Sequence, residues 1–146
     1  MKNFITKLIG FVVTFSFLAI TLSLSGCSSG KSTSGSASLE GTGWILETLN
    51  GKSIPITNGN NVTLKFDEAT GKVSGSGSCN TFFGSYKLDG SALKFSEIGS
   101  TKMMCDEMPV ETDYFSALQK TDKYEIKSGK LNLYSSSSVI LVFKKK

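Results

Sequence analysis

The chain has 146 residues, of which 16 are basic and 12 acidic, and it contains no histidine. Every basic residue is a lysine, so the sequence offers neither an imidazole proton shuttle nor the guanidinium fork that binds carboxylates and phosphates. These absences exclude a Ser-His-Asp or Cys-His catalytic arrangement and an imidazole zinc site, and the even balance of charge gives no reason to expect nucleic-acid binding.

The first 26 residues have the organisation of a cleaved export signal. Lys2 and Lys7 precede an apolar stretch at residues 8–24, which Thr and Ser interrupt and which falls short of the roughly 20 apolar residues of a membrane-spanning helix. Leu-Ser-Gly-Cys at residues 24–27 resembles the lipobox of bacterial lipoproteins. We therefore expect cleavage after residue 26 and a lipid anchor on Cys27, at the exported side of a cell membrane or outer membrane. An ordinary signal peptide or an uncleaved anchor is the alternative.

Residues 27–39 are expected to form a tether between the lipid and a folded domain. The segment at residues 28–38 reads Ser-Ser-Gly-Lys-Ser-Thr-Ser-Gly-Ser-Ala-Ser. This composition is typical of a flexible linker, with a root-mean-square span of roughly 15 to 20 Å. One small domain is then expected at residues 40–146, and we expect it to be a monomer.

Short strand-like segments follow, with turn residues between them. Apolar and polar residues alternate over the segments 44–49, 62–66, 73–77, 82–88 and 93–95, as in strands with one buried face. Asn-Gly at residues 50–51 and Asp-Gly at 89–90 are typical of hairpin turns. Gly75 and Gly77 open no helix, so we interpret them as strand glycines at a bulge or close backbone approach and not as part of a nucleotide-binding loop.

A different periodicity then predicts one helix. Val110, Tyr114 and Leu118 recur every four residues, and Pro109 suits the first turn of a helix. Glu111 adds negative charge near the positive end of the helix dipole.

Strand character returns at residues 124–126, 131–133 and 139–143. The last of these segments is apolar on both faces, which predicts a central or doubly covered strand. Three lysines end the chain at residues 144–146, where they could contact anionic lipid or simply be solvated. The order of elements predicts an α+β domain, in which a curved antiparallel β-sheet or partial barrel of about seven to eight strands packs around one α-helix.

Several motifs occur in a fixed order along the domain. They are Trp-Ile-Leu at 44–46 with Asn-Gly at 50–51, Gly-Ser-Cys-Asn at 77–80, Phe-Gly at 83–84 with Tyr86, Ser-Thr-Lys-Met-Met-Cys at 100–105, then Glu111, Phe115, Leu118, Leu131 and Leu133. Together they resemble the META domain family of bacterial envelope proteins, also called HslJ-like, over residues 41–143. One departure is Ser78, where the family usually has Gly. If that Gly has a conformation costly for Ser, the turn should differ locally.

The resemblance implies no established catalytic chemistry, and it associates the chain with stress response, drug tolerance and motility. It also implies that Cys79 pairs with Cys105, since the family carries a correlated pair of cysteines at these positions. Judged from the residues alone, two cysteines remain in an exported domain once Cys27 is lipidated, which favours one disulfide. A metal site and two reduced core cysteines are the alternatives, although two thiolates without His leave zinc short of ligands.

We therefore expect a noncatalytic envelope lipoprotein, held at the membrane by its lipid and in contact with another envelope protein or active in stress or drug tolerance. We expect no catalytic residue, no cofactor, no metal and no nucleic-acid partner. The alternative is a lipoprotein that binds a small apolar ligand, a lipid or a drug, among its 10 Phe, 4 Tyr and 1 Trp. An enzyme built on carboxylates and lysine is the third hypothesis.

Overall fold

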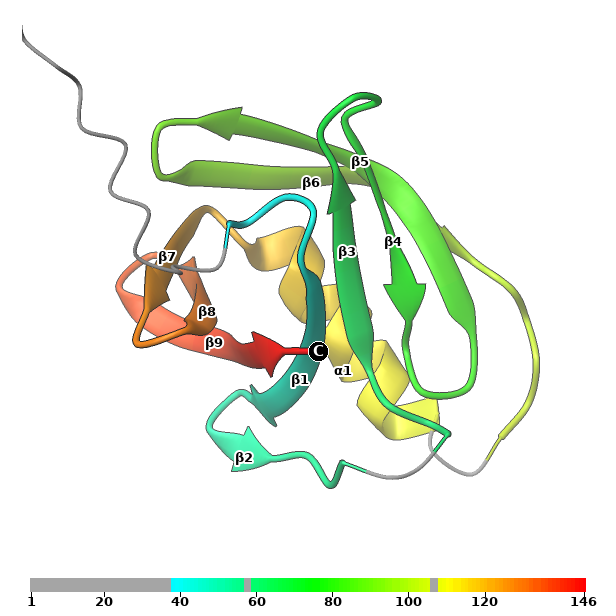
Figure 1. The fold of residues 1–146 in the computed structure, drawn as a ribbon. Coiled ribbons are helices and arrows are strands. Elements are labelled where there is room, and N and C mark those ends of the chain that lie inside the picture. Colours follow the sequence, from blue (N-terminus) through cyan, green and yellow to red (C-terminus); the bar gives the residue numbers. More distant parts are fainter. Residues whose placement is uncertain (1–37, 57–58, 106–107) are drawn as a thin grey trace, which may run out of the picture. The chain divides into compact units, whose positions relative to one another are not determined.

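The computed structural model describes residues 38–56, 59–105 and 108–146, all of which belong to one compact unit at residues 33–146. The expected signal peptide, Cys27 and nearly all of the tether lie outside the described residues. The described part of the chain forms nine strands and one helix (Figure 1). That helix is too short or too polar to cross a membrane.

The elements follow one another in a simple order. They are β1 (Gly43–Leu49), β2 (Lys52–Ser53), β3 (Thr63–Asp67), β4 (Lys72–Ser76), β5 (Thr81–Asp89), β6 (Ala92–Ser100), α1 (Met108–Lys120), β7 (Lys123–Lys127), β8 (Lys130–Ser135) and β9 (Ser138–Lys145).

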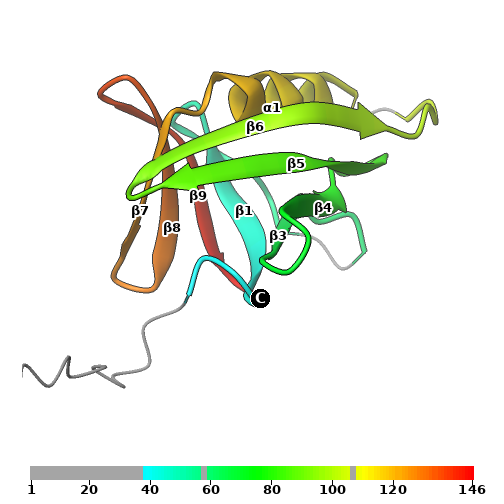
Figure 2. The same cartoon turned by 90° about the horizontal axis from the view of Figure 1, so that it is seen from above.

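All the pairings are antiparallel. From β3 to β9 each strand pairs with the next one in the chain, β2 pairs with β1 alone, and the sheet closes into a ring because β1 pairs with both β3 and β9. Gly43 faces Lys65 of β3, and Leu46 faces Phe143 of β9. The seam between β6 and β7 is the shortest of the ring, since it contains the single residue pair Ala92 and Lys123. The ring can be followed in Figures 1 and 2.

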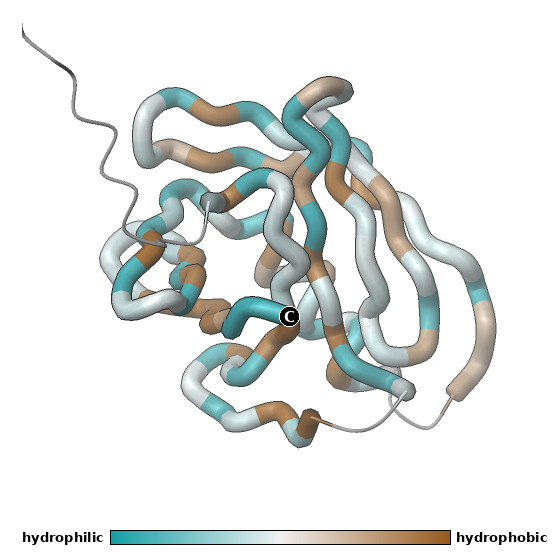
Figure 3. The backbone as a smooth tube through the Cα atoms, viewed as in Figure 1, coloured by the Kyte–Doolittle hydropathy of each residue, from teal (hydrophilic) through white to brown (hydrophobic). Residues whose placement is uncertain are grey.

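Hydrophobic and hydrophilic residues alternate along the strands (Figure 3), and the buried apolar side chains form the core inside the ring. Trp44 and Leu46 of β1 and Leu141 and Phe143 of β9 are completely or almost completely buried. The indole N–H of Trp44 donates a hydrogen bond of 3.0 Å to the carbonyl oxygen of Leu39. This bond fixes the start of the domain to the core.

Helix α1 packs against β1 and β6 and buries Tyr114 and Leu118 completely. The Tyr114 ring lies 5.7 Å from the Phe82 ring and 6.3 Å from the Phe143 ring. Its hydroxyl donates to the carbonyl oxygen of Thr63 at 3.1 Å, so the one polar atom of this buried side chain has a partner. The helix therefore joins β3, β5 and β9 through a single side chain.

The α+β class and the single helix packed against a curved sheet are as predicted. Strand β2 was not predicted, because Lys52 and Ser53 are exposed and carry no apolar signal. The prediction that residues 139–143 form a central or doubly covered strand is confirmed in its first form, because β9 is central, between β8 and β1, while Val139 is 41% exposed. The predicted close approach at Gly75 is confirmed, since a Cβ atom there would lie 2.1 Å from the carbonyl oxygen of Thr63.

Candidate functional site

The turn between β4 and β5 brings three of the sequence motifs together. Its backbone closes through the N–H of Gly77, which donates to the carbonyl oxygen of Asn80 at 2.7 Å. A Cβ atom on Gly77 would lie 2.8 Å from the Cγ and Oε2 atoms of Glu111. Glycine at position 77 therefore allows the helix to approach the turn.

Ser78 stands at the position where the family usually has Gly. Its φ is 96°, in the region that favours glycine, so Ser adopts a conformation that is costly for a residue with a Cβ atom. The Ser78 N–H donates to Ser76 Oγ and its hydroxyl donates to the carbonyl oxygen of Asn60, both at 3.3 Å. The expectation of a locally different turn stays a prediction.

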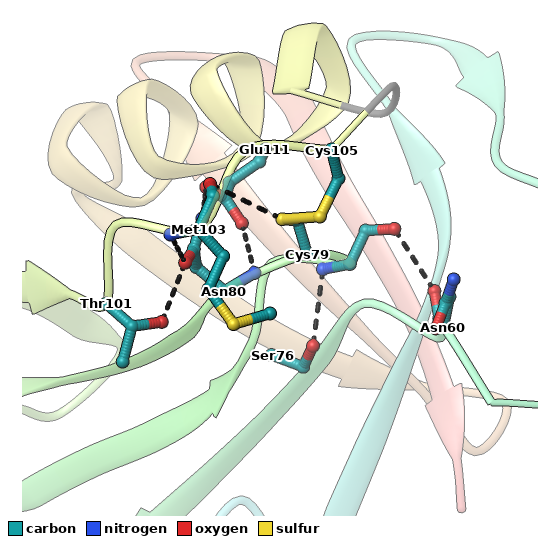
Figure 4. The surroundings of a disulfide bond; sticks show 9 residues. Asn60, Ser76, Cys79, Asn80, Thr101, Met103, Cys105 and Glu111 are labelled. Atoms are coloured by element: carbon teal, nitrogen blue, oxygen red, sulfur yellow. Dashed lines mark hydrogen bonds between the residues drawn. A yellow bond between two sulfur atoms is a disulfide. The ribbon is translucent and has the colours of Figure 1, made fainter.

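Asn80 makes five hydrogen bonds that join the turn to its neighbours, and only 1% of its surface is exposed. Its backbone N–H and its Nδ2 each donate to Glu111 at 2.7 Å, to Oε2 and Oε1 respectively. Its Oδ1 accepts from the Thr101 hydroxyl and from the Met103 N–H, both at 2.7 Å, and its Nδ2 also donates to the Met103 carbonyl oxygen at 3.1 Å. Every polar atom of the Asn80 side chain is thus used (Figure 4).

Glu111 is 3% exposed and lies in the first turn of α1. Burying a carboxylate is costly unless hydrogen bonds compensate it, and here two N–H groups of Asn80 do so while the positive end of the helix dipole favours the negative charge. The sequence indicates Glu111 as a helix-dipole charge and as a match to the family helix, but not its contact with Asn80. The two residues are 31 positions apart in the chain, so no local pattern reveals that contact.

The structure joins Cys79 to Cys105, with an S–S distance of 2.04 Å and Cα atoms 6.0 Å apart. This pairing is the one that the family resemblance implies. The bridge ties the β4–β5 turn to the segment that leads from β6 into α1 (Figure 4). Cys27, the other residue singled out from the sequence, lies outside the described residues.

A surface groove of about 580 Å³ lies beside this bridge. Met103 and Met104 are exposed next to it, by 57% and 90% respectively. Asn80 holds the N–H and the C=O of Met103, so buried polar contacts fix the backbone of an exposed apolar residue. The groove is lined by Asn80, residues 100–104, Glu111, Thr112, Phe115, Ser116 and Gln119.

The polar groups of this site form hydrogen bonds with one another, so the arrangement is suited to fixing the backbone that carries the exposed methionines. The described ranges contain no group of three or more acidic or cysteine side chains that could hold a metal ion.

A hydrogen-bonded chain of Lys, Ser and Glu lies elsewhere, on the outer face of the sheet. Lys72 Nζ donates to Ser85 Oγ, which donates to Glu97 Oε2, both at 3.0 Å. Lys72 gives a hydrogen bond to the serine there, whereas a lysine that activates a serine nucleophile must accept its proton.

The model of the META domain family matches residues 37–146 of the chain. The chain belongs to the META domain family. The resemblance carried by the motifs is therefore confirmed, and the META residues that it rests on, among them Cys79, Asn80, Cys105 and Glu111, converge in one place.

The META fold of this chain is also similar to two structures solved by NMR. One is of a protein from Burkholderia xenovorans, with 26% sequence identity over 74% of this chain and 83% of that chain and a TM-score of 0.59. The other has 25% identity over 70% of this chain and 87% of that chain and a TM-score of 0.57. No curated protein matches the chain significantly.

Proposed function

We propose that this META domain protein is a noncatalytic, lipid-anchored protein of the cell envelope that binds another envelope protein through Met103 and Met104. The observation that carries the proposal is a pair of exposed methionines on a backbone held by Asn80 and by the Cys79–Cys105 bridge. Methionine is enriched at protein interfaces because its flexible, polarisable side chain adapts to a partner. A backbone that is already ordered loses less entropy when the partner binds.

The backbone beside the methionines also suits an extended segment of a partner. The Thr101 N–H donates to the carbonyl oxygen of Thr81 at 3.1 Å. Because successive residues of a strand turn their N–H and C=O groups to opposite sides, those of Ser100 point away from β5. Ser100 lines the groove, so a peptide lying there could bond to this edge of β6 while Met103 and Met104 contact its apolar side chains.

The lipid anchor is supported by the lipobox-like motif that ends at Cys27 and by the Ser/Gly-rich segment between it and the domain. More than one acyl chain is needed for stable anchoring, which is what bacterial lipoproteins carry. Mass spectrometry of the mature amino-terminal peptide tests this part of the proposal. An unmodified Cys27, or a chain that begins at another residue, contradicts it.

Site-specific photo-crosslinking in intact cells tests the binding surface. A photoreactive amino acid at Met104 should give one discrete protein adduct, whereas the same group at Asp89, exposed at the end of β5, should not. Met103→Lys should remove the adduct without lowering the melting temperature, because that side chain is mostly exposed. If Met104 gives no more adduct than Asp89, the proposed surface is wrong. A role in stress or drug tolerance predicts that Met103→Lys also removes that phenotype.

A small apolar ligand is the second candidate, because the groove volume falls within the roughly 300 to 1,000 Å³ of typical ligand pockets. The groove is nevertheless on the surface, and aromatic and aliphatic side chains fill the ring interior. In the same experiment, an adduct with the mass of a lipid or other small molecule in place of a protein would favour this candidate.

A further inference from the structure

The register of the last three strands aligns three lysines across the sheet. Lys127 of β7 faces Lys130 of β8, and Lys130 faces Lys144 of β9. The next residues of β8 and β9 toward the middle of the sheet, Leu131 and Phe143, are fully buried and point inward. Since side chains alternate along a strand, Lys130 and Lys144 point outward. We call Lys127, Lys130 and Lys144 the lysine row.

The lysine row is unfavourable for folding, because like charges that face each other across strands repel. The described residues contain one ion pair to the row: Lys130 Nζ lies 2.7 Å from Glu47 Oε2. Lys127 and Lys144 have no such ion pair within residues 38–56, 59–105 and 108–146. A row of this kind is what a surface for an anionic partner would require.

The lysine row lies at the end of the domain where the chain from the expected tether enters. The described chain begins next to Leu39, and the N–H of Lys146 donates to the carbonyl oxygen of Gly43 at 2.8 Å. Lys145 pairs with Trp44 of β1 and therefore alternates to the other face of β9, but it is exposed, like Lys146, at the same end of the strand. Figure 2 shows the β7–β8 turn, the end of the chain and the start of the described residues on the same lower side.

Acidic residues at this end are engaged or lie farther along the ring. Glu40 accepts a hydrogen bond from the hydroxyl of Tyr86. Glu125, exposed on β7, also accepts a hydrogen bond, from the Tyr134 hydroxyl at 2.7 Å. Asp67, at the end of β3, and Glu68 are separated from β9 by β1. The side formed by β7, β8 and β9 therefore presents mainly positive charge.

We propose that the lysine row, with Lys145 and Lys146, docks onto the anionic headgroups of the membrane that anchors the protein. The proposal rests on the lipid anchor of the proposed function, since a tether spanning roughly 15 to 20 Å keeps this end close to the bilayer. Each lysine near an anionic surface strengthens association by about fivefold at moderate ionic strength, and salt weakens the attraction. The contact orients a domain that the tether alone leaves free to rotate.

The test uses the mature full chain reconstituted in vesicles of phosphatidylcholine, with or without phosphatidylglycerol. Lysine acetylation by a water-soluble reagent is followed residue by residue by mass spectrometry. We expect at least fivefold slower acetylation of the lysine row in the anionic vesicles, lost in high salt. Lys87 and Lys94, a facing pair of exposed lysines on β5 and β6, are the matched control and should not change.

The variant Lys127→Gln/Lys144→Gln separates membrane contact from a structural role. It should lose most of the protection at Lys130, and it should raise the melting temperature in low salt because the like charges are removed. Lys52→Gln/Lys94→Gln removes the same charge from exposed positions of other strands and should leave the protection unchanged.

Three outcomes would overturn the proposal: no protection of the row in anionic vesicles, equal protection of Lys87 and Lys94, or protection by dissolved polyphosphate but not by phosphatidylglycerol. The intact mass of the reconstituted protein is measured in the same sample. It shows whether Cys27 carries lipid, so a failure of the anchor is distinguished from a failure of the lysine row.

Discussion

Replacing Asn80 with Asp should lower the free energy of unfolding of the domain more than most single substitutions of a buried residue, although Asn and Asp have the same size. The change removes the Nδ2 donor that Glu111 Oε1 and the Met103 carbonyl oxygen share, at 2.7 and 3.1 Å. It also places a second carboxylate against that of Glu111 in a site that excludes water. Loss of a hydrogen bond to a charged group, loss of a neutral one and the new repulsion together should cost about 4 kcal/mol or more.

A second change should restore much of this loss. In Asn80→Asp/Glu111→Gln the new amide can donate to the new carboxylate, while its oxygen still accepts the backbone N–H of residue 80 that now bonds to Glu111 at 2.7 Å. Only the 3.1 Å bond to Met103 stays lost. We therefore expect the double variant to be more stable than Asn80→Asp by about 2 kcal/mol, a coupling energy typical of side chains in direct contact.

Urea denaturation followed by the fluorescence of Trp44 measures these free energies. Trp44 is the single Trp of the chain and is fully buried, so its emission reports global unfolding. Asn60→Asp adds the same charge at an exposed position and should change the stability by less than about 0.5 kcal/mol. If the effects of Asn80→Asp and Glu111→Gln simply add in the double variant, the pair does not act as the structure indicates.

Three further changes act on the same domain. Removing the bridge with Cys79→Ala/Cys105→Ala, which opens a loop of 26 residues, should lower the free energy of unfolding by about 3 kcal/mol, and an unchanged urea midpoint would contradict this. Ser78→Gly should raise it by about 0.5 to 1 kcal/mol because φ is 96°, whereas a loss of stability would show that the two 3.3 Å bonds matter more. Burial raises the pKa of Tyr114 well above its usual value of 10.0, so the unfolded chain releases this proton first and stability should fall as pH rises above about 10. Tyr114→Phe should reduce that fall, measured as the urea midpoint between pH 8 and 11.

The strands could be predicted because alternation of polar and apolar residues is a local signal. The closure of the ring could not, because it depends on β1 pairing with both β3 and β9, and no pattern within residues 44–49 identifies two partners. The central position of β9 could be predicted, because the segment at residues 139–143 is apolar on both faces, but the exposure of Val139 could not.

The site could be predicted only in part, because its contacts, like the closure of the ring, join residues that are far apart in the chain. The two cysteines could be placed by family resemblance, but the hydrogen bonds of Asn80 reach 21, 23 and 31 residues along the chain and leave no periodic trace. At Ser78 the φ of 96° is unfavourable for a non-glycine residue, and the bridge at the next residue, Cys79, and the hydrogen bonds of Asn80 help to hold this conformation.

The two proposed surfaces make a joint prediction about orientation. Met103 and Met104 follow the far end of β6, whereas the lysine row and the entry of the chain lie at the opposite side of the view in Figure 2. A domain held by the lysine row would therefore present its methionines to the aqueous side of the envelope. Releasing it with Lys127→Gln/Lys144→Gln should let the photoreactive group at Met104 reach the bilayer, so lipid adducts should increase while the protein adduct decreases. If both yields stay constant, the lysine row does not orient the domain, even if Met104 binds its partner.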